Sequence, residues 1–166
     1  MIHPAPRLLQ AGFFPSTSAP IAPTAGVRHP ALLHATAASE FSRMQRAFLP
    51  SGGLVDSENF TGWLDGRTDQ PVSRLARWIV AHDVISLPWQ SRAMLPVFQF
   101  DANLAPHPAV TRVIRELYPV LEDWDIGLWF IEPNLWLDGA TPVDSIRWKP
   151  GDVFEAARGY RYLANA

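Results

Sequence analysis

Residues 129–146 read WFIEPNLWLDGATPVDSI, and this stretch decides how the C-terminal part of the chain folds. Pro133 is expected to end an apolar helix, because proline cannot donate a backbone hydrogen bond and clashes with the preceding turn. Gly139 permits a tight turn, since glycine adopts positive φ without a steric penalty. Thr141 and Pro142 suit the N-cap and the first residue of a second helix. The stretch therefore predicts a helix, a tight turn and another helix.

The other residues of this stretch support the same turn. The apolar residues Leu135, Trp136 and Leu137 are expected to fill the angle between the two helices. Asp144 lies three residues after the Thr141 cap, where an acid favours the start of a helix. On this interpretation the motif is structural and carries no chemistry; its residues are Pro133, Asn134, Leu137, Gly139, Thr141, Pro142 and Asp144.

Helices are also predicted on both sides of the motif. Residues 122–131 begin with acids, which stabilise a helix N-terminus, and then become apolar. Residues 108–121 carry an apolar stripe at helical spacing, with His107 as the expected cap and Pro119 near the end. Residues 152–163 predict a last helix, with Asp152 as its N-cap.

The preceding part of the chain is predicted to be mostly helical as well. Residues 71–82 have apolar residues at helical spacing, while residues 56–64 and 40–49 suit shorter helices. The apolar runs 84–89 and 94–100 suit a short β-hairpin, although Pro88 and Pro96 favour irregular edge strands. We therefore expect a mostly α fold, with residues 37–166 forming one small helical domain.

The N-terminal part differs in composition from the rest. Residues 1–50 hold four arginines and one acid, whereas residues 51–166 hold ten basic and fifteen acidic residues. Proline, alanine, serine and threonine dominate residues 1–36, which are expected to form a disordered tail. The whole chain has 166 residues, 48% apolar residues and a net charge of −2. It can bury a sizeable core and has no global basic field that would favour non-specific nucleic-acid binding.

The sequence offers little for catalysis. The chain has no cysteine, which excludes disulfides, thiolate zinc sites and a cysteine nucleophile, and suits a reducing cytoplasm. Neither a Gly-x-Ser-x-Gly elbow nor a phosphate-binding glycine loop is present. The acids at positions 122, 123 and 125 are best explained as the first turn of a helix. We expect no catalytic residue, no metal site and no cofactor, and no membrane span in the apolar run at residues 8–27, which three prolines interrupt.

Arginine and tryptophan instead indicate binding. Thirteen of the fourteen basic residues are arginines, whose planar guanidinium makes bidentate bonds to carboxylates and phosphates. Four tryptophans lie between residues 124 and 148; most are expected in the core, and any left exposed would mark a protein-binding surface.

Residues 129–146 are similar to the signature of the Xre/MbcA/ParS toxin-binding domain, in which Trp, Pro-Asn, Leu, Gly, Pro and an acid precede an apolar pair. Residues 152–158 resemble the final helix of that family, and residues 95–117 resemble the upstream part of its longer members. The likeness covers about residues 70–166, with residues 122–166 as the toxin-binding part.

The resemblance implies an antitoxin, not an enzyme, that covers the active site of a partner toxin, usually an NAD-degrading toxin of the RES type. Such a protein would be bacterial and cytoplasmic, and a homodimer is compatible with it. The C-terminal region docks on the toxin in this family, and two Tyr and two Arg there have the composition of a binding hot spot. The residues expected to bind the partner are Arg158, Tyr160, Arg161 and Tyr162, with Trp129 and Trp136.

Two other functions remain open at this level. Many members of the family also carry a DNA-binding helix-turn-helix and repress their own operon, so a transcriptional regulator is the alternative. The pattern of residues 56–90 does not predict a two-helix reader with a basic face, which argues against DNA binding. A small enzyme with an unrecognised site is the third.

Overall fold

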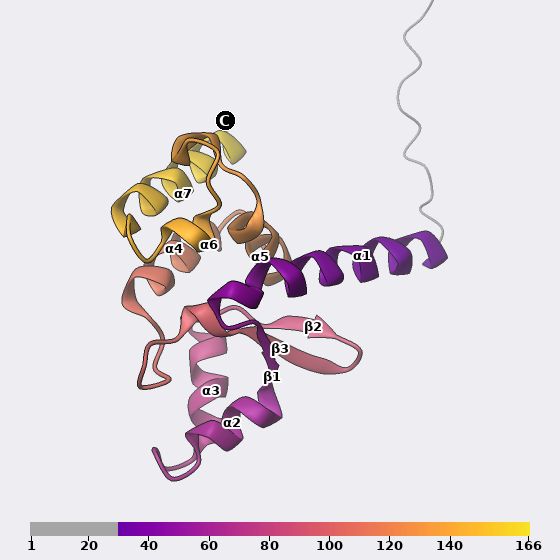
Figure 1. Cartoon of the computed structure of the whole chain (residues 1–166), viewed down its shortest axis with the longest axis vertical. Coiled ribbons are helices and arrows are strands. Elements are labelled where there is room, and N and C mark those ends of the chain that lie inside the picture. Colours follow the sequence, from indigo (N-terminus) through magenta and orange to yellow (C-terminus); the bar gives the residue numbers. More distant parts are fainter. Residues whose placement is uncertain (1–29) are drawn as a thin grey trace, which may run out of the picture.

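The computed structural model describes residues 30–166, with side chains from residue 34 onward. Seven α-helices and a three-stranded sheet make up this part of the chain (Figure 1), which confirms the mostly α fold with a small hairpin. Residues 1–29, most of the predicted tail, lie outside the described residues. Residues 30–36, assigned to the tail from sequence, belong to the first helix.

The elements follow one another in a simple order. The helices are α1 Pro30–Phe48, α2 Ser57–Leu64, α3 Pro71–Val80, α4 Pro108–Leu117, α5 Asp123–Ile131, α6 Pro142–Ser145 and α7 Pro150–Ala164. The strands are β1 Leu54–Asp56, β2 Leu87–Trp89 and β3 Arg92–Pro96. Three short 3₁₀ turns are η1 Leu49–Ser51, η2 Val97–Gln99 and η3 Leu135–Leu137.

The sheet is antiparallel with the order β1-β3-β2. The predicted hairpin forms, and its turn places Gln90 and Ser91 at φ 47° and 63°, the left-handed pair that suits a tight hairpin. Pro88 lies on the edge strand β2, and Pro96 is the last residue of β3. Strand β1 was not predicted, because three residues are too short to show an alternating pattern.

Buried side chains form two clusters on either side of this sheet. The larger cluster joins α1 to the C-terminal helices, and α4 packs along α7. The smaller cluster lies under α2 and α3 and consists of Val55, Phe60, Leu64, Leu75, Val84, Leu95 and Phe100. Figure 1 shows the same division, with α4, α6 and α7 above the sheet and α2 and α3 below it.

Helix α1 is longer than the sequence pattern predicted. No proline occurs between Pro30 and Pro50, and alanine-rich residues of high helix propensity extend the helix back to Pro30, a favourable first position. Its second half packs on the body, with the ring of Phe41 stacked 4.3 Å from that of Trp89. Glu40 accepts a hydrogen bond from the indole of Trp124 at 2.8 Å.

A buried amide holds the segment before β2 against η2. Gln99 is fully buried, and its side chain accepts from the backbone N–H of Ile85 at 2.8 Å and donates to the carbonyl of Ile85 at 3.0 Å. A second tie links Asp123 to the backbone N–H of Ser86 at 2.8 Å. Burial raises the pKa of Asp123 above its usual value, and this hydrogen bond opposes the rise.

Two helix ends differ from the prediction, and a third agrees with it. Helix α7 begins at Pro150 with Lys149 as its N-cap, so the expectation of an Asp152 cap was wrong. Proline at the first position fixes φ and needs no capping partner for its missing N–H. Helix α4 ends at Leu117, two residues before Pro119, and His107 caps its start as predicted, with Nδ1 accepting from the N–H of Ala109.

Candidate protein-binding surface

The predicted helix–turn–helix junction at residues 129–146 forms, and Asn134 organises it. The residue before Pro133 is extended, as proline requires, and α5 ends there. The side chain of Asn134 accepts from the N–H of Trp136 at 2.9 Å, and its carbonyl accepts from Leu137 and Gly139. Its own N–H donates to Ala140 at 3.0 Å. One residue therefore closes the whole turn.

The far end of the turn also has the predicted geometry. Gly139 has φ +83°, and Asp138 before it is left-handed as well. The hydroxyl of Thr141 accepts from the N–H of Asp144 at 3.3 Å and lies 2.6 Å from the Asp144 carboxylate. Pro142 is the buried first residue of α6. These residues fix the position of Trp136 relative to α7.

Gly139→Ala is expected to lower the free energy of unfolding by about 1–2 kcal/mol, because a β-carbon disfavours positive φ. No atom lies within 4 Å of the position that a β-carbon would take, so the backbone conformation alone sets the loss. Gly62→Ala in α2 is the control, since its surroundings are equally open and its φ is not positive. Urea denaturation that finds equal effects at the two sites would contradict this account.

The apolar residues of the turn do not fill the angle as predicted. Only Leu137 is buried in the core, whereas Leu135 is 91% exposed and Trp136 is 52% exposed. The reason is geometric: η3 is a single 3₁₀ turn whose three side chains point in three directions. Two large apolar side chains are therefore left on the surface of the molecule.

Trp136 lies against α7 at Gly159. A β-carbon at Gly159 would overlap with Cη2 and Cζ3 of the Trp136 ring, so only glycine admits the indole there. The ring stands between two hollows and lines both of them. We call this region, comprising η3, the end of α5 and the second half of α7, the C-terminal face.

The first hollow is mainly apolar and has a volume of about 230 Å³. Trp129, Trp136, Tyr160 and Leu163 contribute to its wall. Trp129, predicted to contact the partner, is only 6% exposed and belongs to the core as well as to this wall. Its indole Nε1 is buried without a hydrogen-bond partner among the described residues.

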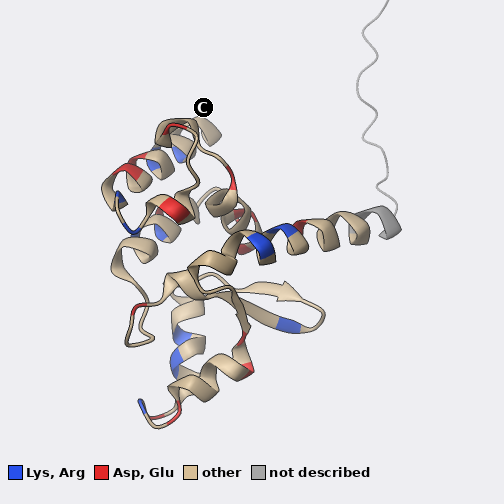
Figure 2. Cartoon of the chain, viewed as in Figure 1, with Lys and Arg blue, Asp and Glu red and all other residues tan. Residues whose placement is uncertain are grey.

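The second hollow is open, charged and about 730 Å³ in volume. Arg158 and Arg161 line it, and both are already paired: Arg158 with Glu155 at 3.0 Å, and Arg161 with Glu116 of α4 at 3.3 Å. Tyr162 also lines it and is 75% exposed. Figure 2 shows acidic and basic residues close together on α7 and its neighbours, so this hollow has no single sign of charge.

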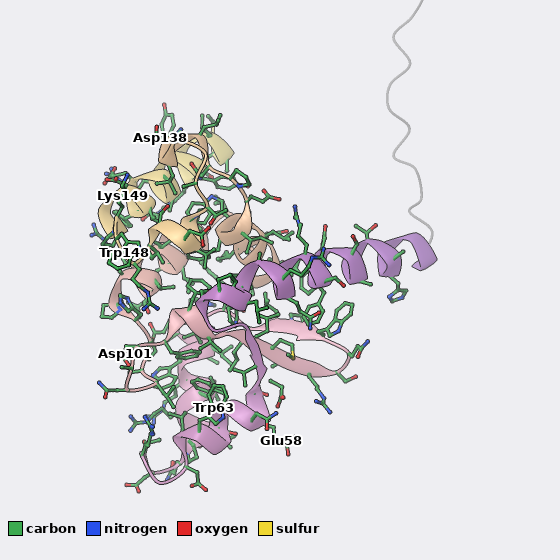
Figure 3. All side chains as sticks on the ribbon, viewed as in Figure 1. Glu58, Trp63, Asp101, Asp138, Trp148 and Lys149 are labelled. Carbon is green, nitrogen blue, oxygen red and sulfur yellow. The ribbon has the colours of Figure 1, made fainter. Side chains whose placement is uncertain are left out.

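The structure thus brings five of the six predicted binding residues to the outside of one face and places Trp129 behind it. Two further tryptophans are exposed elsewhere: Trp148 at 81%, beside Lys149, and Trp63 at 47%, on α2 (Figure 3). The expectation that most tryptophans between 124 and 148 lie in the core was wrong for Trp136 and Trp148.

No group of three or more metal-ligating side chains occurs within the described part of the chain. None of the helices described between residues 30 and 166 is long and apolar enough to cross a membrane.

Comparison of the chain with models of protein families, with curated proteins and with solved structures found no match.

Proposed function

We propose that this protein is an antitoxin-like binding protein whose C-terminal face covers the active site of a partner toxin enzyme. The observation that carries the proposal is a cluster of exposed apolar side chains on that face. Large exposed apolar patches on a protein of this size indicate a binding surface. Its members are Leu135, Trp136, Tyr160, Tyr162 and Leu163, which are 91%, 52%, 39%, 75% and 66% exposed.

The composition of the face supports a protein partner. Tryptophan, tyrosine and arginine dominate binding hot spots, because they bury large areas with few rotatable bonds or make bidentate hydrogen bonds. Trp136 and Tyr160 line the apolar hollow, which suits a protruding side chain of the partner. The ion pairs of Arg158 and Arg161 line the neighbouring charged hollow and supply polar groups beside the apolar one, as the rim of an interface does.

The position of the face also suits a blocking role. The last buried residue of α7 is Ala157, and the rest of the helix carries exposed or half-buried side chains. A helix that projects such side chains can insert them into a concave site of a partner. The sequence resemblance implies an NAD-degrading enzyme of the RES type as that partner.

Co-expression with the product of the adjacent gene tests the proposal. Wild-type protein is expected to restore growth and to co-purify with that product. Deletion of residues 158–166 removes no buried residue of α7, so the truncated chain should fold and fail to rescue. Leu49→Ala is the control, because it removes an exposed apolar side chain of η1, outside the face, and should leave rescue intact. Full rescue by the truncated, folded chain would overturn the proposal.

A second candidate function is DNA binding, and one structural observation favours it. Helices α2 and α3 pack as a pair and are followed by the β2–β3 hairpin, a connectivity compatible with a helix-turn-helix reader that the sequence pattern did not predict. Arg74 and Arg77 are exposed on α3, and Arg92 lies on the hairpin. Five acids between residues 54 and 96 outnumber the four arginines there, which places this candidate second.

Binding to a fragment of the protein's own promoter at increasing salt distinguishes the two candidates. A DNA-binding role predicts an affinity that falls steeply as the salt concentration rises. If Arg74 contacts a phosphate, Arg74→Ala should reduce the slope of log affinity against log salt concentration by about one. Protein that rescues the co-expressed toxin and shows no salt-dependent DNA binding would support the first candidate alone.

A further inference from the structure

A third hollow lies away from the C-terminal face and has a different character. It has a volume of about 290 Å³ and is formed by the loop after β3, the start of α4 and α6. None of its lining residues lines either hollow of the C-terminal face. We call it the Phe100 pocket.

The floor of the Phe100 pocket is aromatic and aliphatic. Phe98, Phe100, Val143 and Ile146 contribute to it, and each is 7% exposed or less. These side chains belong to the cores of the fold, so the floor is fixed by packing. Pockets with such a floor and a few polar groups at the rim are the usual form of small-molecule sites.

The loop at the rim is held in one conformation. Asp101 accepts the N–H groups of Asn103 and Ala105 on a single oxygen, Oδ1, at 2.8 and 3.0 Å. Leu104 has φ +61°, a left-handed conformation that a leucine adopts only when its surroundings enforce it. The backbone N–H of His107 donates to the carbonyl of Gln99 at 2.8 Å. The rim is therefore preorganised for a ligand.

Two hydrogen-bond donors at the rim have no acceptor in the described structure. His107 accepts the N–H of Ala109 at Nδ1, so a neutral imidazole carries its hydrogen on Nε2 and can donate it. Arg147 is exposed and lines the pocket, and its side chain forms no hydrogen bond or ion pair with residues 34–166. A guanidinium fork and an imidazole N–H beside an apolar floor match a carboxylate attached to an apolar group.

We infer that the Phe100 pocket binds a small carboxylic acid with an aromatic body, whose ring lies on the Phe98–Phe100 floor and whose carboxylate meets Arg147 and His107. Asp101 also lines the pocket and repels an anionic ligand. This repulsion is weaker than that of a carboxylate without hydrogen bonds, because two N–H groups donate to Oδ1. An aromatic amine would place its positively charged ammonium beside the positively charged Arg147 and would therefore bind more weakly than the acid. This inference is independent of the proposed antitoxin role, because the two sites share no residue.

Titration of the full chain with phenylacetate, phenylacetamide and 2-phenylethylamine, followed by two-dimensional NMR, tests the inference. Phenylacetate is expected to give saturable shifts around the Phe100 pocket with a Kd on the order of 1 mM, as suits a ligand of this size. The neutral amide and the amine should bind about tenfold more weakly or not at all, because a charged hydrogen bond is lost.

Substitutions of Arg147 complete the experiment. Arg147→Ala is expected to weaken phenylacetate binding about tenfold, and Arg147→Lys should restore part of it by keeping the charge without the fork. Arg158→Ala on α7, where the arginine pairs with Glu155, is the matched control and should bind normally. The same spectra report whether each variant is folded. Absence of saturable shifts, equal binding of the amide, tighter binding of the amine, or unchanged binding by Arg147→Ala would each overturn the inference.

Discussion

Gln99→Leu is expected to lower the free energy of unfolding by about 3 kcal/mol. Gln99 is fully buried and makes two hydrogen bonds to the backbone of Ile85. Leucine has similar volume but leaves the N–H and the carbonyl of Ile85 buried without partners. Each such group costs about 1–3 kcal/mol, and the added apolar contact offsets only part of that cost.

Gln45→Leu provides the control for this substitution. Gln45 lies on the exposed side of α1 and takes part in no side-chain hydrogen bond within the described chain, so the same chemical change should alter stability by less than about 0.5 kcal/mol. Urea denaturation of the two variants at pH 7 makes the comparison. A Gln99→Leu variant as stable as Gln45→Leu would mean that the backbone N–H and carbonyl of Ile85 find other partners when the amide is absent.

The burial of Gln99 could not be predicted from the sequence. The run 94–100 is apolar apart from Gln99, and nothing in its spacing shows whether the amide of Gln99 is buried or exposed. Its partner is the backbone of a residue fourteen positions away, and backbone groups leave no trace in the sequence. The same holds for β1, whose three residues are strand because β3 offers them hydrogen bonds.

The turn at residues 133–144 could be predicted because its chemistry is local. Proline, glycine and threonine each restrict the backbone of their own position or the next few residues, so their types alone set the junction. The outward position of Trp136 could not be predicted in this way. It depends on Gly159, which lies twenty-three residues later and admits the indole only because α7 returns beside η3. The sequence did offer one indication, a glycine within the helical pattern of residues 152–163. Glycine weakens a helix, so its presence there indicates close packing or a functional role.

Gly159→Ala is expected to weaken partner binding about thirtyfold or more while leaving the fold intact. A β-carbon at this position would overlap with the Trp136 ring, which is half exposed and free to turn outward. The indole would then leave its place between the two hollows and would no longer line either of them. Hot-spot tryptophans contribute about 2 kcal/mol or more to binding, which corresponds to the expected loss.

The stability of the Gly159→Ala variant separates this effect from unfolding. Alanine is better than glycine in a helix by about 1 kcal/mol, so the gain in α7 should offset the lost contact of Trp136 and leave the free energy of unfolding within about 1 kcal/mol of wild type. Gly151→Ala, in the first turn of the same helix, has no atom within 4 Å of its β-carbon position and should leave Trp136 and partner binding unchanged. The indole N–H resonance of Trp136, assigned by its loss in Trp136→Phe, reports the movement of the ring. If Gly159→Ala moves this resonance but still binds the co-expressed partner as tightly as wild type, Trp136 is not part of the interface. The charged hollow lined by Arg158, Arg161 and Tyr162 would then be the next candidate for the binding surface.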